Sequence, residues 1–302
     1  MSIRWVATEL HMHTLHSDGW FTPEELARAL HGRGFEAGAL TDHNCISATP
    51  GFEKEAERLG IVSIPGMEAT TFFGHVLSLG TTEYVEWRDL DKETGLAVLS
   101  RRIHAAGGLC GLAHPFEPGG WIRTGSYLDY DWDGTQCMDY VEVWNGPEVH
   151  RNPFNRRSYR WWLELLDKGI RVPATSGRDW HRLDEPEGST HACNYLGVPE
   201  GEAVTARSLL AAVQAGRVVV THGPLPLLEV EGDRVRVHVR EGRGGEGKHL
   251  LRLIVPGGEE LASFDVQVGF EGTVELKGAQ RVHAEIYRGG EMAGFTSPCY
   301  VE

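Results

Sequence analysis

The first residues in the chain that could do chemistry stand where a short apolar run over residues 5–10 ends in His11-Met12-His13. Because side chains alternate faces along an extended strand, His11 and His13 point to one side and Met12 points to the other. Two imidazoles at one strand end make half of a first-row metal site. Asp18 follows just before a glycine, where a turn can bring its carboxylate back over the same cavity. The chain has 15 histidines, so a metal-site hypothesis needs partners elsewhere.

Such partners follow further strand-like runs along the chain. Thr41-Asp42-His43 comes after one apolar run, Glu68 is expected just past another, and His114 comes directly after a third. Their shared property is a position at or near the carboxyl end of a predicted strand, where side chains of neighbouring strands meet. The residues of ligand type in such positions are His11, His13, Asp18, His43, Glu68, His75, His114, Asp179 and His181.

The segments that must position these residues alternate between strand and helix about seven times. Thr22-Pro23-Glu24-Glu25 predicts a helix start, with a Thr N-cap, Pro in the first turn and Glu three residues after the cap. This alternation is typical of a parallel β/α barrel, which carries its chemistry at the carboxyl strand ends. Strands are expected at residues 5–10, 35–40, 61–64, 72–80, 109–113, 139–143 and 170–174, and helices at 22–32, 49–59, 93–106, 155–168 and 206–215.

After Pro224 the pattern changes to short alternating runs separated by glycine-rich turns, with no helix signal. This texture predicts a small all-β sandwich of about 75 residues. We therefore expect two domains, an α/β barrel over residues 1–224 and a β-sandwich over residues 225–302. His238, His249 and His283 lack carboxylate companions in this region and are expected at the surface or in packing.

Composition excludes several functional classes. The net charge of −14 argues against stable binding to nucleic acid or an anionic membrane, both of which need a basic surface. It leaves an anionic small-molecule substrate open, because bound cations would dominate the local field. No run approaches the ~20 apolar residues of a membrane span, and no signal-peptide pattern opens the chain. The five scattered cysteines form no Cys-x-x-Cys motif, which predicts a reducing cytoplasm.

Taken together, the polar clusters resemble those of the polymerase and histidinol phosphatase (PHP) superfamily over about residues 5–225. The segment 142–146 and the ending 215–224 with its β tail are similar to the carbaryl-hydrolase-like branch of that superfamily. The motifs that carry the resemblance are His11-x-His13, Asp18-Gly19, Thr41-Asp42-His43, Pro65-Gly66-x-Glu68, His75, His114-Pro115 and Asp179-x-His181.

The resemblance implies a distorted seven-stranded β/α barrel with two or three divalent metal ions. By the same resemblance, the first metal would take His11, His13, Glu68 and Asp179. The second would take Glu68 as a bridge with His75 and His114, and the third would take Asp18, His43 and His181. Arg178 departs from the family pattern, which has a small residue at this position. It is expected either to reach a substrate anion or to pair with a nearby acid.

Mixed imidazole and carboxylate ligands favour zinc, manganese or iron. A hydroxide bridging two such ions can attack phosphorus or a carbonyl carbon, so no side-chain nucleophile is needed. The leading hypothesis is a metal-dependent phosphoesterase acting on a small phosphate mono- or diester, with catalytic roles for Glu68, Asp179, His181 and Arg178. Asp42 is expected to orient a ligand histidine rather than bind metal, and His16 is expected outside the ligand set.

Two other functions stay open at this point. The same hydroxide could cleave a carboxylic ester, amide or carbamate, or the chain could be a metal-holding scaffold without catalysis. A proofreading nuclease is disfavoured by the acidic charge. The sequence leaves the oligomeric state open. Candidate substrate contacts are the arginines Arg123, Arg151, Arg156 and Arg157, although each one taken singly is better explained as a solvated surface residue. The tryptophans Trp121, Trp144 and Trp180 could wall a pocket, and each could equally be core.

Overall fold

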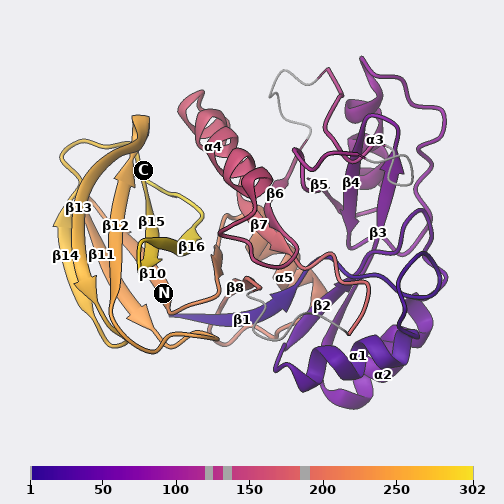
Figure 1. Ribbon diagram of the computed structural model, residues 1–302, viewed down its shortest axis with the longest axis horizontal. Helices are drawn as coiled ribbons and strands as arrows, with labels where there is room; N and C mark the ends of the chain where they lie inside the picture. The colour runs from indigo at the N-terminus through magenta and orange to yellow at the C-terminus, as the bar shows by residue number, and fades with distance from the viewer. Residues whose placement is uncertain (1, 120–124, 132–137, 184–190, 302) are drawn as a thin grey trace.

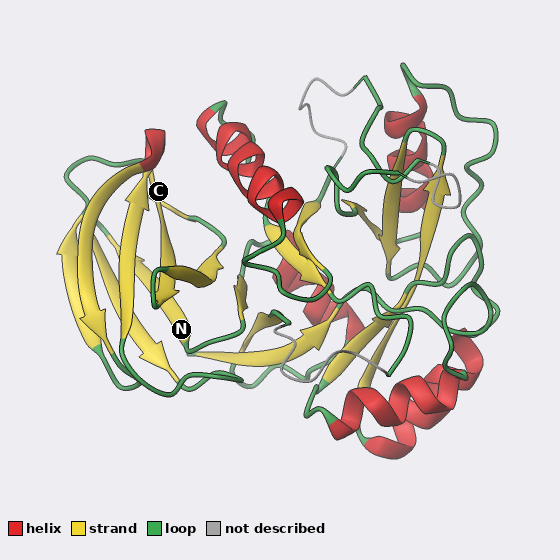
Figure 2. Cartoon of the chain, in the orientation of Figure 1, coloured by secondary structure: helices red, strands yellow, loops and turns green. Residues whose placement is uncertain are grey.

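The computed structural model describes residues 2–119, 125–131, 138–183 and 191–301. Over these residues the chain is an α/β fold in which strands outnumber helices (Figure 2). No helix in this part of the chain is long and apolar enough to cross a membrane. The α-helices are α1 (Pro23–Gly32), α2 (Thr49–Leu59), α3 (Gly95–Ala105), α4 (Pro153–Asp167) and α5 (Ala206–Gln214).

Seven strands form the barrel-like part of the fold (Figure 1). Strands β1–β3 are parallel to one another, and so are β5–β7, but β4 runs antiparallel to both β3 and β5. The prediction of an all-parallel barrel is therefore wrong at β4. Only two residues separate Thr71 from its partner Gly74, whereas a parallel pair needs a crossover of a dozen or so residues. The strands are β1 (Ile3–Glu9), β2 (Ala37–Leu40), β3 (Val62–Thr71), β4 (Gly74–Leu79), β5 (Leu109–Leu112), β6 (Tyr140–Asn145) and β7 (Ala174–Gly177).

The ring of strands closes at its carboxyl end. Beyond β1 and β7 the chain continues in a short parallel bridge between Met12 and Trp180. There the amide of Trp180 donates to the carbonyl of His11 at 3.2 Å, and the amide of His13 donates to the carbonyl of Trp180 at 3.0 Å. The first and last strands of the ring are thus joined next to the residues of ligand type.

The helix signals read from the sequence are confirmed. The Thr22 hydroxyl accepts from the Glu25 amide at 3.2 Å, and the Glu25 carboxylate accepts from the Thr22 amide at 2.9 Å, a reciprocal cap at the start of α1. Helix α2 ends at Gly60, whose φ of 72° a residue with a side chain rarely adopts. Apolar faces of both helices are buried in one cluster with Ala7 of β1 and Leu40 of β2, so the two helices cover this side of the barrel.

One sheet runs without a break from the barrel into the C-terminal strands. Strand β1 pairs antiparallel with β8 (Cys193–Pro199), β8 pairs with β9 (Val218–Thr221), and β9 pairs with β16 (Glu291–Thr296). β8 was not predicted, because it is buried on both faces and so lacks polar alternation. β16 and the short β17 (Cys299–Tyr300) were not predicted either.

The remaining C-terminal strands form two sheets around one apolar core. β10, β11 and β14 make a three-stranded sheet, while β12, β13 and β15 continue the large one. Val237, Leu253 and Ile286 come from the two sheets and belong to the same buried cluster. These strands are β10 (Leu225–Glu231), β11 (Arg234–Arg240), β12 (His249–Val255), β13 (Glu259–Val266), β14 (Glu271–Glu275) and β15 (Arg281–Arg288), with a short 3-10 turn at Pro256–Gly258.

Candidate metal centre

The end of β1 presents two histidines to the inside of the barrel, as the alternation predicts. His11 and His13 are fully buried, and the centres of their rings lie 5.0 Å apart. Met12 between them points away from the cavity and packs in an apolar cluster with Leu30 of α1 and Leu40 of β2. The strand thus delivers two imidazoles to one cavity at the closed end of the ring.

Glu68 and Asp179 complete a compact group of four ligand atoms with these histidines. The Nε2 atom of His11 lies 3.1 Å from Glu68 Oε2 and 3.5 Å from Asp179 Oδ1. The Nε2 atom of His13 lies 3.5 Å from Glu68 Oε2 and 3.0 Å from Asp179 Oδ1. Four ligands at roughly 2.1 Å from a tetrahedral ion lie about 3.4 Å from one another, so these separations suit one cation.

The other oxygen of Glu68 faces a different pair of histidines. Glu68 Oε1 lies 2.8 Å from His75 Nδ1 and 3.3 Å from His114 Nε2. A carboxylate whose two oxygens face two imidazole groups is the arrangement expected of a bridging ligand. Glu68 lies within β3, opposite Leu77 of β4, and not past the strand end as predicted, because the strand continues to Thr71.

A third group forms at the rim of the cavity. Asp18 Oδ1 lies 3.0 Å from His181 Nε2 and 3.5 Å from His43 Nε2. His181 is oriented by its own loop, since its Nδ1 donates to the backbone carbonyl of Asp179 at 2.7 Å. His13 stands within reach of the same group, so it lies between the first and third groups.

All nine residues of ligand type are therefore brought to one end of the barrel, but their grouping differs in part from the predicted one. The groups whose ligand atoms lie within 4.8 Å of one another are His11–His13–Glu68–Asp179, His13–Asp18–His43–His181 and His43–Glu68–His75. His114, predicted for the second metal, is beside Glu68 Oε1 at 3.3 Å but outside these three groups.

The electrostatics of the cavity favour a cation. Burial opposes ionisation of Glu68 and Asp179, yet the surrounding imidazoles hold the pKa of both carboxyls well below their usual range. Burial, reinforced by His43 and His181, lowers the pKa of His13 to about 4, so its ring is neutral at physiological pH. Ionised carboxylates and the neutral His13 ring are the protonation states that metal ligands need. Against the effect of burial, the neighbouring carboxylates raise the pKa of His11, His43, His114 and His181, so a bound cation would displace protons from these rings.

Two of the four ligand atoms in the first group are buried and have no hydrogen bond within the described residues. They are His13 Nε2 and Asp179 Oδ1, which face each other without hydrogen-bonding geometry. A buried polar atom left unpaired is costly, and a cation between these atoms would satisfy both. The donor set therefore fits a divalent metal with mixed nitrogen and oxygen ligands.

Glu142 is a functional residue that the sequence reasoning did not assign to the site. Its Oε2 lies 2.9 Å from His11 Nδ1, and its Oε1 accepts from Asn145 Nδ2 at 2.8 Å. Such a carboxylate orients a ligand histidine and fixes its tautomer. Gly177 makes this contact possible, because a Cβ there would lie 2.1 Å from Glu142 Oε2. The signal in the sequence was an acid between the apolar residues Val141 and Val143 of the buried strand β6.

The backbone is strained where two of the ligand-type residues leave their strands. His114 has φ of 27° and Asp179 has φ of 50°, both in the left-handed region that residues with a Cβ rarely adopt. Strain of this kind persists only where the surroundings hold it in place, and it concentrates at functional sites.

Glu9 joins the ends of β1 and β7 beneath the cavity. Its Oε1 accepts from the amides of Leu10, His11 and Arg178 at 3.0, 3.1 and 2.9 Å. Burial raises the pKa of Glu9 to about 7, although the nearby charge of Arg178 opposes that rise. Glu9 was not assigned a role from the sequence.

The geometry favours one of the two expectations for Arg178. The side chain is 7% exposed and its guanidinium lies 4.3 Å from the ring centre of Trp180. Its charge acts on buried Glu9, so pairing with an acid fits better than contact with a substrate. Trp180 is 1% exposed and packs edge-on against Phe21, which makes it a core residue.

Asp42 takes a different role from the one predicted. Its carboxylate accepts from the Thr14 amide, the Thr14 hydroxyl and the Ser17 hydroxyl, each at 2.6 Å. It therefore holds the loop that carries Asp18. Nδ1 of His43 instead lies 2.6 Å from the Thr70 hydroxyl and 2.9 Å from Glu68 Oε2. His16 lies on the outer side of the same loop, with its Nδ1 2.7 Å from the Ser47 hydroxyl.

The predicted substrate arginines that the structure describes lie near the start of α4. Arg157 donates to the Tyr127 hydroxyl at 2.9 Å and lies over Phe116, while Arg151 and Arg156 line a separate cavity together with Trp144. Arg123 and Trp121 are outside the described residues.

Comparison with known proteins agrees with this geometry. Residues 9–142 match the model of the PHP domain. The match includes seven of the nine ligand-type residues and ends before Asp179 and His181. An uncharacterized protein of Methanocaldococcus jannaschii is 27% identical over 155 residues, which make up 48% of this chain and 83% of that protein. A 5'-3' exoribonuclease of Haemophilus influenzae is 36% identical over 63 residues, 21% of this chain and 23% of that enzyme.

Among solved structures, the chain is similar to a two-domain protein of Bacteroides vulgatus described as containing a predicted PHP-like metal-dependent phosphoesterase. The TM-score is 0.61 at 17% sequence identity, with 98% of this chain and 96% of that chain covered. At this identity the likeness shows a shared fold, and that fold includes the C-terminal strands.

Proposed function

We propose that this protein is a metal-dependent hydrolase of small phosphate mono- or diesters. The observation that carries the proposal is the position of Glu68, whose Oε2 belongs to a four-atom group with His11, His13 and Asp179 and whose Oε1 faces His75 and His114. A carboxylate shared in this way suits two divalent ions, as in two-metal hydrolases. The PHP match over residues 9–142 supports the same class of reaction.

The ligand groups would hold two or three ions of zinc, manganese or iron. Bound there, the ions would supply a water acidified for nucleophilic attack and positive charge for the phosphate oxygens. The protein's own part is to hold the ligands: Glu142 orients His11, the Asp179 carbonyl orients His181, and Glu9 ties the strand ends together. We propose direct roles for Glu68, Asp179 and His181 and a positioning role for Arg178.

Water as the nucleophile agrees with the state of the Cys45 thiol, which stands two residues after His43 in the chain. Burial raises the pKa of Cys45, and its Sγ lies 3.3 Å from the carbonyl of His16. A protonated thiol engaged in this way is a poor nucleophile. The nearby Thr14 and Ser17 hydroxyls are also engaged, because both donate to Asp42.

We further propose that residues 1–224 form the hydrolase domain and residues 225–302 an accessory domain, and that the branch of the superfamily is the carbaryl-hydrolase-like one. Among the described residues all cysteines are free thiols, which supports a reducing cytoplasm as the location. The net charge of −14 supports a small-molecule substrate and not a nucleic acid.

The test is one set of turnover assays on metal-stripped protein reloaded with manganese, zinc or iron. The substrates are p-nitrophenyl phosphate, bis(p-nitrophenyl) phosphate, p-nitrophenyl acetate and a p-nitrophenyl carbamate. We expect metal-dependent release of p-nitrophenol from a phosphate substrate. Cleavage of only the acetate or the carbamate would contradict the phosphoesterase proposal and support an ester or carbamate hydrolase.

A matched pair of variants ties turnover to the site. Glu68→Gln keeps the shape of the side chain but removes its charge, and we expect it to lose at least ~100-fold in kcat/KM. Glu57→Gln makes the same change on the exposed side of α2 and should behave as wild type. Equal activity of the two variants would refute the role of Glu68. Stoichiometric metal binding without turnover of any substrate would favour a scaffold.

A further inference from the structure

A second cavity lies between α4 and the β15–β16 hairpin, away from the ligand-type residues. Its volume is about 560 Å³, within the ~300–1,000 Å³ typical of small-molecule sites. None of the residues that line it belongs to the three groups of ligand-type residues. The cavity therefore needs an explanation of its own.

One wall of the cavity is apolar. Trp144 and Val149 come from the end of β6 and the loop after it, Leu163 comes from α4, and Met292 comes from β16. Trp144 packs edge-on against Phe295, with ring centres 4.9 Å apart, so it is a rigid wall. An apolar wall of this kind gains free energy by covering an apolar ligand.

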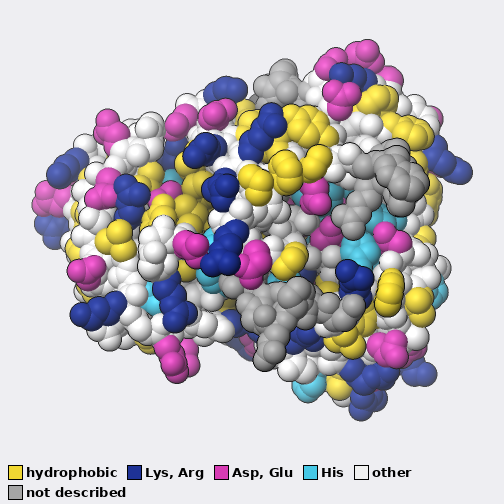
Figure 3. Space-filling view, viewed as in Figure 1, with side chains coloured by type: hydrophobic (Ala, Val, Ile, Leu, Met, Phe, Trp, Pro, Cys, Tyr) yellow, Lys and Arg dark blue, Asp and Glu magenta, His cyan; other side chains and the backbone are white. Residues whose placement is uncertain are grey.

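The rest of the lining includes three arginines and the acid Glu291. Arg151, Arg156 and Arg160 line the cavity, and lysine and arginine side chains gather over α4 in Figure 3. Arg151 is close to Glu291, with Nε 3.5 Å from Oε1, and Arg156 donates to the Arg151 carbonyl at 2.9 Å. The Arg160 side chain makes no hydrogen bond or ion pair within the described part of the chain. Its guanidinium is thus available to an anion.

A buried histidine supplies an independent sign of a missing partner. The His150 side chain is 7% exposed and lines the cavity, yet neither ring nitrogen has a hydrogen bond within the described residues. Its Nε2 is 3.0 Å from Glu291 Oε2 but outside hydrogen-bonding geometry. Because buried polar groups are nearly always paired, we expect an oxygen of a ligand to form the missing hydrogen bond with the His150 ring.

The buried acid in the cavity does not oppose an anionic ligand as strongly as its charge would suggest. Glu285 accepts hydrogen bonds from the Tyr159 hydroxyl at 2.7 Å and from the Tyr287 hydroxyl at 2.6 Å. Both carboxylate oxygens are thus engaged by donors, which disperse the negative charge.

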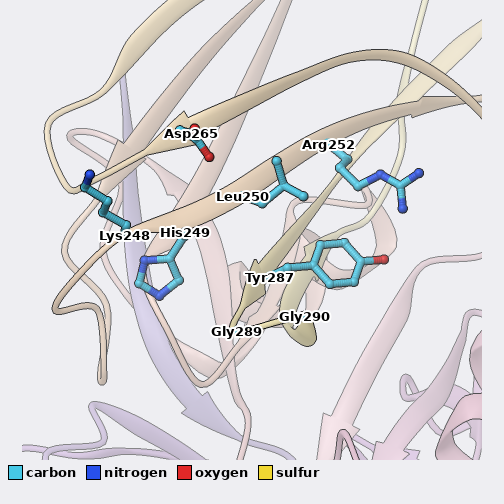
Figure 4. A pocket seen from close by; sticks show the side chains of 8 residues that line it. All are labelled: Lys248, His249, Leu250, Arg252, Asp265, Tyr287, Gly289 and Gly290. Carbon is cyan, nitrogen blue, oxygen red and sulfur yellow. The ribbon is translucent and has the colours of Figure 1, made fainter.

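The hollow continues past the hairpin. Tyr287 and Gly290 also line a neighbouring depression of about 340 Å³, where Lys248 and Arg252 add two more cationic side chains (Figure 4). A ligand longer than the first cavity could therefore extend along β12 over a surface that is again partly cationic.

From these observations we propose that the cavity between α4 and β15–β16 binds a small amphiphilic anion. The ligand carries a carboxylate, sulfonate or phosphate for Arg160 and His150 and an apolar body for the wall of Trp144 and Met292. The site is distinct from the metal centre, although β6 contributes to both. A register shift between Glu142 and Trp144 lets Glu142 face His11 while Trp144 faces the cavity. The proposal does not depend on the hydrolase activity.

The test uses 1-anilinonaphthalene-8-sulfonate, whose rings and sulfonate match this chemistry and whose fluorescence rises on binding. We expect saturable binding of one probe per chain. Arg160→Gln should weaken binding by about 10-fold, and Met292→Trp should abolish it by filling the apolar side. Octanoate should displace the probe, whereas 1-octanol at the same concentration should not.

Two control variants make the result decisive. Arg101→Gln removes the same charge from an exposed position on α3 and should bind as wild type. Glu68→Gln alters the metal centre and should also leave binding unchanged. Equal affinity of Arg160→Gln and wild type, displacement by octanol alone, or loss of binding in Glu68→Gln would each overturn the proposal. Thermal melts of each variant verify that it is folded.

Discussion

Replacing Glu142 by Gln should weaken metal binding although residue 142 is not itself a ligand. In the wild type one carboxylate oxygen accepts from His11 Nδ1 at 2.9 Å and the other accepts from Asn145 Nδ2 at 2.8 Å. A glutamine has only one oxygen, so its amide nitrogen must face a donor on one side or the other. Either orientation leaves a buried donor unpaired, turns the His11 ring, or forces the Asn145 amide to turn over so that its oxygen accepts from the glutamine.

The expected size of the effect follows from that geometry. Loss of the partner that orients a ligand histidine lowers metal affinity by roughly 10- to 100-fold, or about 1.4–2.8 kcal/mol. The assay is competition for Zn²⁺ or Mn²⁺ between metal-stripped protein and a chromogenic chelator. Glu57→Gln on α2 is the control for loss of one carboxylate charge and should bind metal as wild type does.

A second substitution tests the hydrogen-bond argument itself. In the double variant Glu142→Gln/Asn145→Asp, the new carboxylate at 145 can accept from the glutamine amide, whose oxygen then accepts from His11. Donors and acceptors match again, so affinity should recover by at least half of the loss on a logarithmic scale. Unchanged affinity in Glu142→Gln would refute the orienting role. A double variant no better than Glu142→Gln would show that charge, and not pairing, is responsible.

Three further predictions follow from the same site and from the neighbouring β-strands. Gly177→Ala should destabilise the fold by about 1–3 kcal/mol and reduce turnover, because the new Cβ would lie 2.1 Å from Glu142 Oε2. Urea melts and activity assays measure the two effects. Gly32→Ala is the control, since open space surrounds Gly32, and it should change neither stability nor turnover. Asp18→Asn should lower turnover of phosphate esters more than turnover of p-nitrophenyl acetate if the rim group binds an ion that contacts the phosphate. An equal loss on both substrates would contradict this role. Asp233→Asn, in an exposed turn, is the control. Burial, aided by His150, lowers the pKa of His222 to about 4, so the unfolded chain takes up the proton first and stability falls as the pH drops from about 6.5 towards 4. Urea melts at pH 7 and pH 5 measure the free energy of unfolding. Between these pH values His222→Gln should lose about 2 kcal/mol less of it than wild type does. Equal losses would refute the lowered pKa of His222.

Local order could be predicted from the sequence because local chemistry decides it. The reciprocal cap between Thr22 and Glu25 and the left-handed Gly60 bound two helices by contacts within one turn. The shared side of His11 and His13 follows from strand alternation alone. The set of ligand-type residues was also predictable, since each member stands near a predicted strand end.

The arrangement of that set could be decided only by the tertiary structure. Which oxygen of Glu68 faces which histidine depends on β4 running antiparallel beside β3, a topology set by a two-residue turn. Glu142 meets His11 across 131 positions of sequence, and nothing local marks that contact. The cavity lined by Trp144 and Met292 exists because β16 pairs with β9 and brings the C-terminal strands against α4. Sequence patterns report periodicity and residue type, whereas ligand grouping and cavities depend on long-range packing, which is set by the whole chain at once.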